Sequence, residues 1–190
     1  MEKKTATPSI MKLALVLLAA SAVVALILGL VNHVTKDRIA ELSAEKTATA
    51  YANVLEAASY EELDPSSYEN NGTITKLNAA YDADGNVVGH VAETYFSGAQ
   101  GMITMVVGTD ANNACTGIYV TKSSETAGLG AKASETQEGA WRDNLAGKTL
   151  DTAYLAKDGG SIEAIAGATI TSRACTDEAR YVMYVVGMLG

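Results

Sequence analysis

The stretch that decides the fold is GMITMVVGTDANNACTGIYVTK, residues 101–122. Val, Ile, Thr and Tyr are frequent in both halves, and residues 110–113 between them carry turn-forming Asp and Asn. β-Branched and aromatic residues favour extended chain, and a short polar connection favours antiparallel pairing. The stretch therefore predicts a β-hairpin with strands at about 101–109 and 114–122.

The same pattern extends towards the N-terminus. TITKLNAAYDA at 73–83 and NVVGHVAETY at 86–95 are separated by Asp84-Gly85, a strong hairpin signal. Four strands joined by short turns predict a twisted antiparallel sheet. With helical segments before and after the strands, the expected fold class is α+β.

Two helices are expected after the sheet. Ser134 followed by Gln137 matches a capping box, and Trp141 with Leu145 forms an apolar stripe that ends near Gly147. Residues 149–162 are expected to be a loop with at most one strand. A last helix is expected from about residue 172 to 188.

Residues 13–35 form an apolar run without a formally charged side chain. As a helix, this run would reach roughly 34 Å, enough to cross a hydrocarbon core of about 30 Å. Ala20-Ser21-Ala22 resembles a signal-peptide cleavage site, but the apolar run continues to Leu28. We therefore expect an uncleaved transmembrane helix.

The flanks of this run favour a cytoplasmic N-terminus, because three Lys residues precede it while one Lys and one Arg follow. Residues 36–60 are rich in Ala, Glu and Lys, which suggests a helical stalk that ends at Asp64-Pro65. The expected organisation is a cytoplasmic segment at 1–12, a transmembrane helix at 13–35, a helical stalk at 36–64 and one extracytoplasmic domain at 65–190.

The expected outer part is acidic: residues 36–190 carry 11 basic and 21 acidic side chains, a net charge of −10. Such a surface repels phosphate backbones, so nucleic acid is excluded as a partner. Cys115 and Cys175 lie in no metal-binding spacing, and a disulfide and two free thiols are both open. His33 and His90 are too few and too scattered to form a ligand set, so no metal site is expected.

Two glycine-containing loops carry the chemical signals. In the first, residues 125–130 (ETAGLG), Gly128 and Gly130 would let a flat ligand approach the backbone while Leu129 offers an apolar contact. The second is EAIAGATITSRA, residues 163–174, just before the last helix, where free N–H groups and the helix dipole favour a phosphate. Plain alternatives stay open: a simple turn in the first loop, and in the second an N-cap formed by Thr171 or Ser172.

The second loop resembles the flavinylation motif of the covalent FMN-binding domain family, Asp-x-x-Ser/Thr-Gly-Ala-Thr. The matching residues are Glu163, Ala166, Gly167, Ala168 and Thr169, with Glu163 and Ala166 departing from the usual types. SETAGLGAK and WRDNLAGK resemble the segments found upstream in the Rnf-type members of this family and in the related sodium-translocating quinone reductases, although Ala127 replaces a Pro. The resemblance covers nearly the whole chain.

The resemblance implies a covalent FMN attached to Thr169 through a phosphoester, with Thr171 as the nearby competitor. A threonine hydroxyl is a weak nucleophile, so attachment implies a magnesium-dependent flavin transferase that uses FAD and releases AMP. Besides Thr169, the residues expected around the cofactor are Thr126, Gly128, Leu129, Gly130, Gly167, Ala168 and Thr171.

The family further implies an electron-transfer subunit of a membrane-bound, ion-translocating oxidoreductase of the Rnf type. Its implied partners are other membrane subunits, including a second flavin-carrying subunit and iron-sulphur subunits. Two other functions remain open from the residues: a free-standing membrane-anchored flavoprotein, and a non-redox domain in which both glycine loops are only turns.

Overall fold

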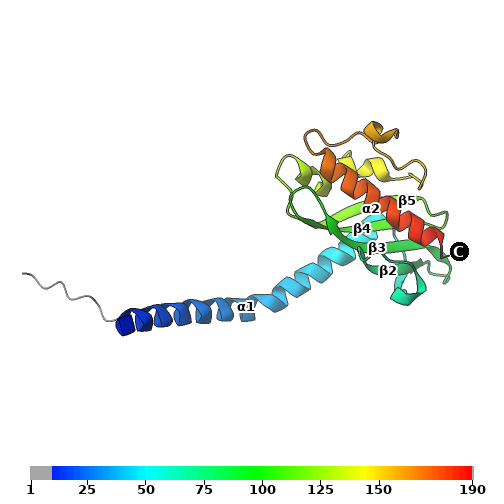
Figure 1. Ribbon diagram of the computed structural model, residues 1–190. Coiled ribbons are helices and arrows are strands. Elements are labelled where there is room, and N and C mark those ends of the chain that lie inside the picture. Colours follow the sequence, from blue (N-terminus) through cyan, green and yellow to red (C-terminus); the bar gives the residue numbers. More distant parts are fainter. Residues whose placement is uncertain (1–9, 190) are drawn as a thin grey trace, which may run out of the picture. The chain divides into compact units, whose positions relative to one another are not determined.

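The computed structural model describes residues 10–189, and the contacts divide the chain into two compact units, Met1–Glu45 and Lys46–Gly190. Helix α1, Ile10–Val54, forms most of the first unit and continues into the second (Figure 1). By length and composition α1 is able to cross a membrane. The expected transmembrane segment, 13–35, lies within it.

The second unit is built on one antiparallel sheet in the order β1-β2-β3-β4-β5. Its strands are β1 (Ser59–Glu62), β2 (Ile74–Tyr81), β3 (Val87–Ser97), β4 (Met102–Asp110) and β5 (Cys115–Ser123). The four strands expected from the sequence are present and pair as neighbours. The expected turn at Asp84-Gly85 is also present: Gly85 has φ +82°, and the Asp82 carboxylate accepts the N–H groups of Asp84 and Asn86. The α+β class is confirmed.

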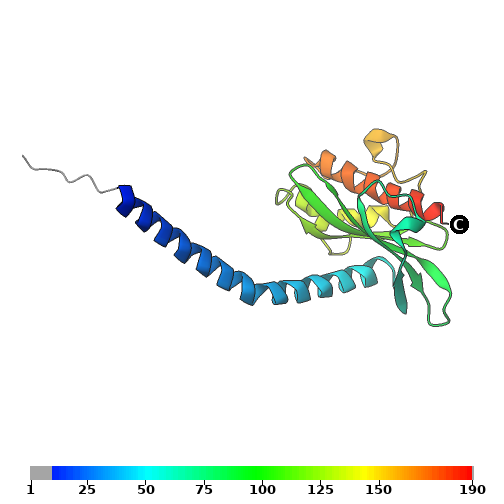
Figure 2. The ribbon, with the colours of Figure 1, turned by 60° about the horizontal axis from the view of Figure 1, so that its bottom comes forward.

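Helix α2, Thr169–Gly187, lies across one face of this sheet (Figures 1 and 2). The alternating side chains of β3 and β4 put one set of residues towards α2, because successive strand residues point to opposite faces. This core contains Ala92, Phe96, Ile103, Met105 and Val107 from the strands and Cys175, Ala179, Val182 and Val186 from α2. Cys115 and Cys175 are both free and buried.

The opposite face of the sheet is covered by the last turns of α1. Ala50, Tyr51 and Val54 pack there against Val91 and Val106. The Tyr51 hydroxyl donates to Glu93 Oε1 at 2.7 Å and accepts from Asn78 Nδ2 at 2.8 Å. The sheet is therefore covered on both faces, by α2 and by the end of α1.

The expected stalk is shorter than the sequence indicated. Helix α1 ends at Val54, and the following segment enters the sheet as β1, where Tyr60 pairs with Ala80 of β2. The free edge of β2 offers hydrogen-bond partners to this segment, and edge pairing overrides its weak helical pattern. The prediction of helix up to residue 64 was therefore wrong at its end.

The expected helix between residues 134 and 147 is also wrong. The chain forms short 3-10 segments instead, η2 (Gly130–Ser134) and η3 (Trp141–Leu145), followed later by η4 (Ala156–Asp158). Ser134 Oγ donates to Ala131 O at 2.6 Å rather than capping a helix, and Gly139 has φ +76°, which breaks helical geometry. Ala133 and Leu145 still reach the core on the side of α2.

Candidate functional site

Thr169 is the first residue of α2, three residues earlier than the start expected for that helix. It is partly buried, and among the described residues, 10–189, no hydrogen bond involves its hydroxyl. Ala168 occupies the N-cap position without a side-chain hydrogen bond, and the first turn contains no acidic residue. The helix N-terminus therefore leaves its N–H groups and dipole available to an anion.

Thr171 has different surroundings although it is only two residues further on. It is fully buried, and its hydroxyl donates to Glu125 Oε2 at 2.6 Å. Ser172 Oγ accepts from the Ile165 N–H at 2.9 Å and donates to Ala168 O at 3.0 Å. Neither residue is the N-cap that the sequence suggested, because both lie inside the helix and bond to segments packed beside it.

Glu125 connects the glycine-leucine-glycine loop to two other segments. Besides the Thr171 hydroxyl, its carboxylate accepts the Gln100 N–H at 3.0 Å, in the turn between β3 and β4. Burial raises the pKa of Glu125, but hydrogen bonds from the Gln100 N–H and the Thr171 hydroxyl, together with the N–H groups of Ala99 and Gly101, outweigh it, so the pKa lies below its ordinary value. The carboxylate is therefore charged at neutral pH.

Three glycines of the two loops occupy positions where a larger residue would be strained or would collide with its neighbours. Gly128 has φ +77°, and the turn that contains it closes with the Leu129 N–H donating to Thr126 O at 3.1 Å. Gly167 has φ +75°, and a Cβ there would stand 2.9 Å from Leu129 Cδ2. A Cβ at Gly130 would collide with the Glu125 carboxylate and the Thr171 hydroxyl. The two loops are therefore in direct contact, which sequence alone does not reveal.

A shallow cavity of about 60 Å³ lies where these segments meet. Six of the residues predicted around the cofactor line it: Thr126, Leu129, Gly130, Gly167, Ala168 and Thr171. Gly128 and Thr169 lie beside these in the chain but do not line the cavity. Ala99, Gln100 and Glu125 also line it and were not predicted as site residues. Glu125 had one sequence signal, its place at the start of the same loop, whereas the 99–100 turn had none.

Trp141 forms a hydrogen bond with the loop that precedes Thr169. The Trp141 indole N–H donates to Glu163 O at 2.7 Å, so the contact uses the backbone of the motif's first residue and not its side chain. The side chains of Glu163 and Ala166, the two departures from the family motif, are exposed. Both departures from the motif therefore lie on the surface of the loop and not in its buried packing.

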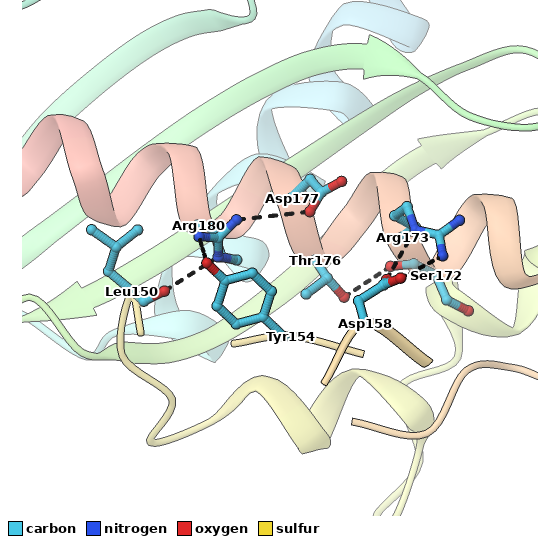
Figure 3. A network of polar contacts seen from close by, with 8 residues as sticks. All are labelled: Leu150, Tyr154, Asp158, Ser172, Arg173, Thr176, Asp177 and Arg180. Atoms are coloured by element: carbon cyan, nitrogen blue, oxygen red, sulfur yellow. Dashed lines mark hydrogen bonds and ion pairs between the residues drawn. The ribbon is translucent and has the colours of Figure 1, made fainter. Parts of the chain in front are cut away.

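Two arginines of α2, Arg173 and Arg180, form contacts with the 149–162 segment (Figure 3). Arg173 forms a bidentate pair with Asp158, with its Nε 3.0 Å and its Nη2 2.8 Å from the two carboxylate oxygens. This hydrogen-bonded pair lowers the pKa of Asp158. Arg180 lies over the Tyr154 ring at 3.8 Å, donates to its hydroxyl and donates to Leu150 O at 3.2 Å. These contacts hold residues 150–158, which precede the motif in the chain, against α2.

Comparisons with known proteins agree with this arrangement. Residues 98–183 match the FMN-binding domain, a range that contains both loops and most of α2. The chain is 36% identical to the G subunit of the ion-translocating oxidoreductase complex of Methanosarcina acetivorans, over 88% of this chain and 89% of that protein. It is 34% identical to the G subunit of the Na(+)-translocating ferredoxin:NAD(+) oxidoreductase complex of Acetobacterium woodii, over 88% of this chain and 86% of that protein.

Other matches carry the same name or a related one. The corresponding G subunit of Escherichia coli K12 is 34% identical over 76% of this chain and 75% of that protein. Among solved structures, Shewanella oneidensis NqrC has a TM-score of 0.47 with 19% identity, over 64% of this chain and 65% of that one. From the identity and coverage of these relatives, the chain belongs to the family of G subunits of ion-translocating oxidoreductase complexes, with an FMN-binding domain at residues 98–183.

Proposed function

We propose that this chain is an electron-transfer subunit of an Rnf-type membrane oxidoreductase and carries FMN on Thr169 through a phosphoester. The family supplies the cofactor and the class of complex. The residue-level part of the proposal rests on one observation, the contrast between the two candidate threonines.

That contrast favours Thr169. The Thr171 hydroxyl is fully buried and donates its proton to Glu125, so a modifying enzyme would have to break this hydrogen bond and open the core to reach it. Thr169 is only partly buried, and its hydroxyl has no partner within residues 10–189. A phosphoester at Thr169 would also lie at the uncapped N-terminus of α2, where the helix dipole favours its negative charge.

The size of the cavity supports a covalent attachment. A pocket that encloses a ligand as large as FMN usually has a volume of roughly 300 Å³ or more. The cavity here measures about 60 Å³, so it does not enclose an FMN. Leu129, which lines it, and Ile170, which follows Thr169 in the chain, are exposed apolar side chains that would offer contact to a flat ring. A cofactor on such an open surface needs a bond to remain attached, and the free hydroxyl of Thr169 supplies one.

The attachment step balances with FAD as the donor. The bond between Thr169 Oγ and the FMN phosphorus forms, the bond from that phosphorus to the bridging oxygen of the FAD pyrophosphate breaks, and AMP leaves with the bridging oxygen. The hydroxyl proton passes to a base of the transferase, because no side chain within residues 10–189 forms a hydrogen bond with the Thr169 hydroxyl. The bound flavin then supplies the electron-transfer chemistry, while this chain's backbone and side chains hold it in place.

The organisation of the chain follows from the same proposal. Residues 13–35 span the membrane with residues 1–12 in the cytoplasm, and the FMN-binding domain lies outside. The sequence has two cysteines, fewer than the four thiolates that usually hold an iron-sulphur cluster, so the proposed iron-sulphur centres belong to other subunits. Electrons therefore come from and pass to other membrane subunits, among them a second flavin carrier and iron-sulphur subunits.

The test is the intact mass of protein produced with a flavin transferase, followed by mapping of the peptide that contains residues 163–174. We expect one added FMN phosphoester on Thr169, and a fluorescent band that survives denaturing electrophoresis. Thr169→Ala should lose both signals, whereas Thr171→Ser should keep them. Persistence of the flavin in Thr169→Ala would place the attachment elsewhere.

Copurification separates the complex from a free-standing flavoprotein. Gentle detergent extraction should recover the chain with several other membrane subunits. Recovery of a flavin-loaded chain alone, with membrane electron transfer unaffected by its deletion, would exclude the Rnf-type assignment while leaving the attachment site intact.

A further inference from the structure

We propose that Glu125 is a positioning residue of the flavin-attachment site: through Thr171 it fixes the first turn of α2 and so presents Thr169 to the transferase. The inference rests on the proposed function, because it concerns the same site. Glu125 itself would form no bond to the cofactor. Its role is to hold the segment that carries the attachment residue.

The carboxylate of Glu125 is the meeting point of three segments that are distant in the chain. It belongs to the 125–130 loop, accepts from Gln100 in the β3–β4 turn, and accepts from Thr171 in α2. The Thr171 contact spans 46 positions of the sequence. Hydrogen bonds to a charged acceptor are roughly twice as strong as neutral ones, so the two contacts tie the segments together firmly.

Two glycines keep the space that this carboxylate occupies. A Cβ at Gly98 would collide with Glu125 Oε1, and a Cβ at Gly130 would collide with Oε2. Gly98 precedes the β3–β4 turn and Gly130 ends the glycine-leucine-glycine loop, so two different segments each restrict one of the carboxylate oxygens. The position of the carboxylate is therefore defined by its surroundings, because both of its oxygens occupy space that a larger residue at Gly98 or Gly130 would fill.

The geometry of a helix transmits this anchoring to Thr169. Residues two positions apart in an α-helix are related by a rotation of about 200°, so their side chains point about 160° apart, given 3.6 residues per turn. When Thr171 is held inward by Glu125, Thr169 must face the outer side, and the intervening Ile170 is 65% exposed. Because Ala168 gives the turn no side-chain cap, its orientation depends on the contacts of Thr171 and Ser172.

The experiment measures the initial rate of FMN attachment to the full-length apoprotein, with purified flavin transferase, FAD and Mg²⁺. Glu125→Ala and Thr171→Val should each slow attachment about tenfold or more, the size expected when a charge-assisted hydrogen bond is lost. Thr171→Ser keeps the donor and should react at the wild-type rate. Glu125→Gln keeps an acceptor without the charge and should fall between wild type and Glu125→Ala.

Thr176→Val is the matched control for loss of a buried hydroxyl. Thr176 is also buried in α2, but its hydroxyl donates at 2.8 Å to Ser172 O within the same helix and does not reach Glu125. We expect this variant to be modified at the wild-type rate even if it lowers the melting temperature. A rate loss in Thr176→Val equal to that in Thr171→Val, or a normal rate in Glu125→Ala, would overturn the proposal.

A second readout needs no flavin. Amide hydrogen exchange of the apoprotein should show loss of protection at the Ile165 and Ser172 amides, which donate to Ser172 Oγ and Ala168 O at the start of α2. This loss is expected for Glu125→Ala and Thr171→Val, and unchanged protection there for Thr176→Val. If the wild-type chain is never modified at Thr169, the proposed function fails, whereas unchanged exchange in Glu125→Ala would refute the positioning role alone. The two failures are therefore distinguishable.

Discussion

Glu125, which accepts a hydrogen bond from α2, and Glu178, which belongs to α2, have pKa values shifted in opposite directions. Hydrogen bonds outweigh burial at Glu125 and lower its pKa. At Glu178, which is 7% exposed, burial dominates and raises the pKa, although the Thr73 hydroxyl donates to its Oε1 at 2.6 Å and acts the other way. The charged form of Glu125 therefore stabilises the fold, whereas Glu178 is better accommodated when neutral.

A pH series on Glu178→Gln tests this difference. The pKa of Glu178 is higher in the folded protein than in the unfolded chain, where it is about 4.5. With respect to this group, the protein therefore keeps its full stability below about pH 4.5 and loses part of it as the pH rises through the pKa of the folded state. The variant stays neutral and still accepts from Thr73. We therefore expect it to melt at a higher temperature than wild type at neutral pH, with the difference shrinking below roughly pH 4.5.

The measurement is thermal unfolding by circular dichroism across this pH range. Asp177→Asn removes a charge from the neighbouring exposed position of α2 and serves as the control. A stability difference for Glu178→Gln that does not change with pH would mean that burial of the charge is not its cause.

At the scale of elements, glycines allow the end of α1 to lie directly on the sheet. A Cβ at Gly108 of β4 would approach Val54 O at 2.8 Å and collide with the Thr116 hydroxyl, which donates to that same carbonyl. At Gly117 of β5 a Cβ would stand 3.9 Å from Val54 Cα, an ordinary contact. The same helix end therefore tolerates a methyl group at one glycine and not at the other.

Gly108→Ala should accordingly destabilise the domain by about 1–3 kcal/mol, because Val54 O is backbone and moves only with the helix. Gly117→Ala should be close to neutral. Chemical denaturation of the two variants side by side checks the prediction. Equal stability of both would show that the end of α1 adjusts its position freely on the sheet.

The elements that the sequence predicted correctly have strong local signals. Residues 73–122 alternate between strand-forming runs and turn residues, so neighbouring strands were expected to pair, and they do. Strand β1, SYEE, has only one partly buried residue and therefore no apolar pattern to detect. The helix expected from residue 134 to about 147 rested on a capping-box pattern and on the spacing of Trp141 and Leu145. Gly139, with φ +76°, interrupts it, and residues 141–145 form the 3-10 segment η3 instead.

At the scale of the whole molecule, the division into two compact units falls within α1, after Glu45. The part of α1 that follows supplies Ala50, Tyr51 and Val54 to the second core cluster. The FMN-binding domain is thus completed by helix that precedes its sheet. We expect the functional boundary of the domain to lie near residue 46 and not near 65.

Two truncations test this boundary. The fragment 46–190 should unfold cooperatively at a temperature close to that of the full chain, because it keeps both faces of the sheet covered. The fragment 56–190 exposes Val91 and Val106 and should lose on the order of 3 kcal/mol, the cost of uncovering one or two large side chains. Equal stabilities in denaturant would show that the end of α1 is dispensable for folding.

By itself, the sequence determined what local chemistry encodes: an apolar helix long enough to span a membrane, the strand and turn order of the sheet, and a motif with two threonines close to the start of the last helix. It left the choice between Thr169 and Thr171 to a resemblance, since both carry the same hydroxyl. The tertiary structure distinguished their surroundings, because the partner that engages Thr171 is Glu125, 46 positions away. A contact of that range depends on the packing of three segments against one another, and no local pattern specifies it.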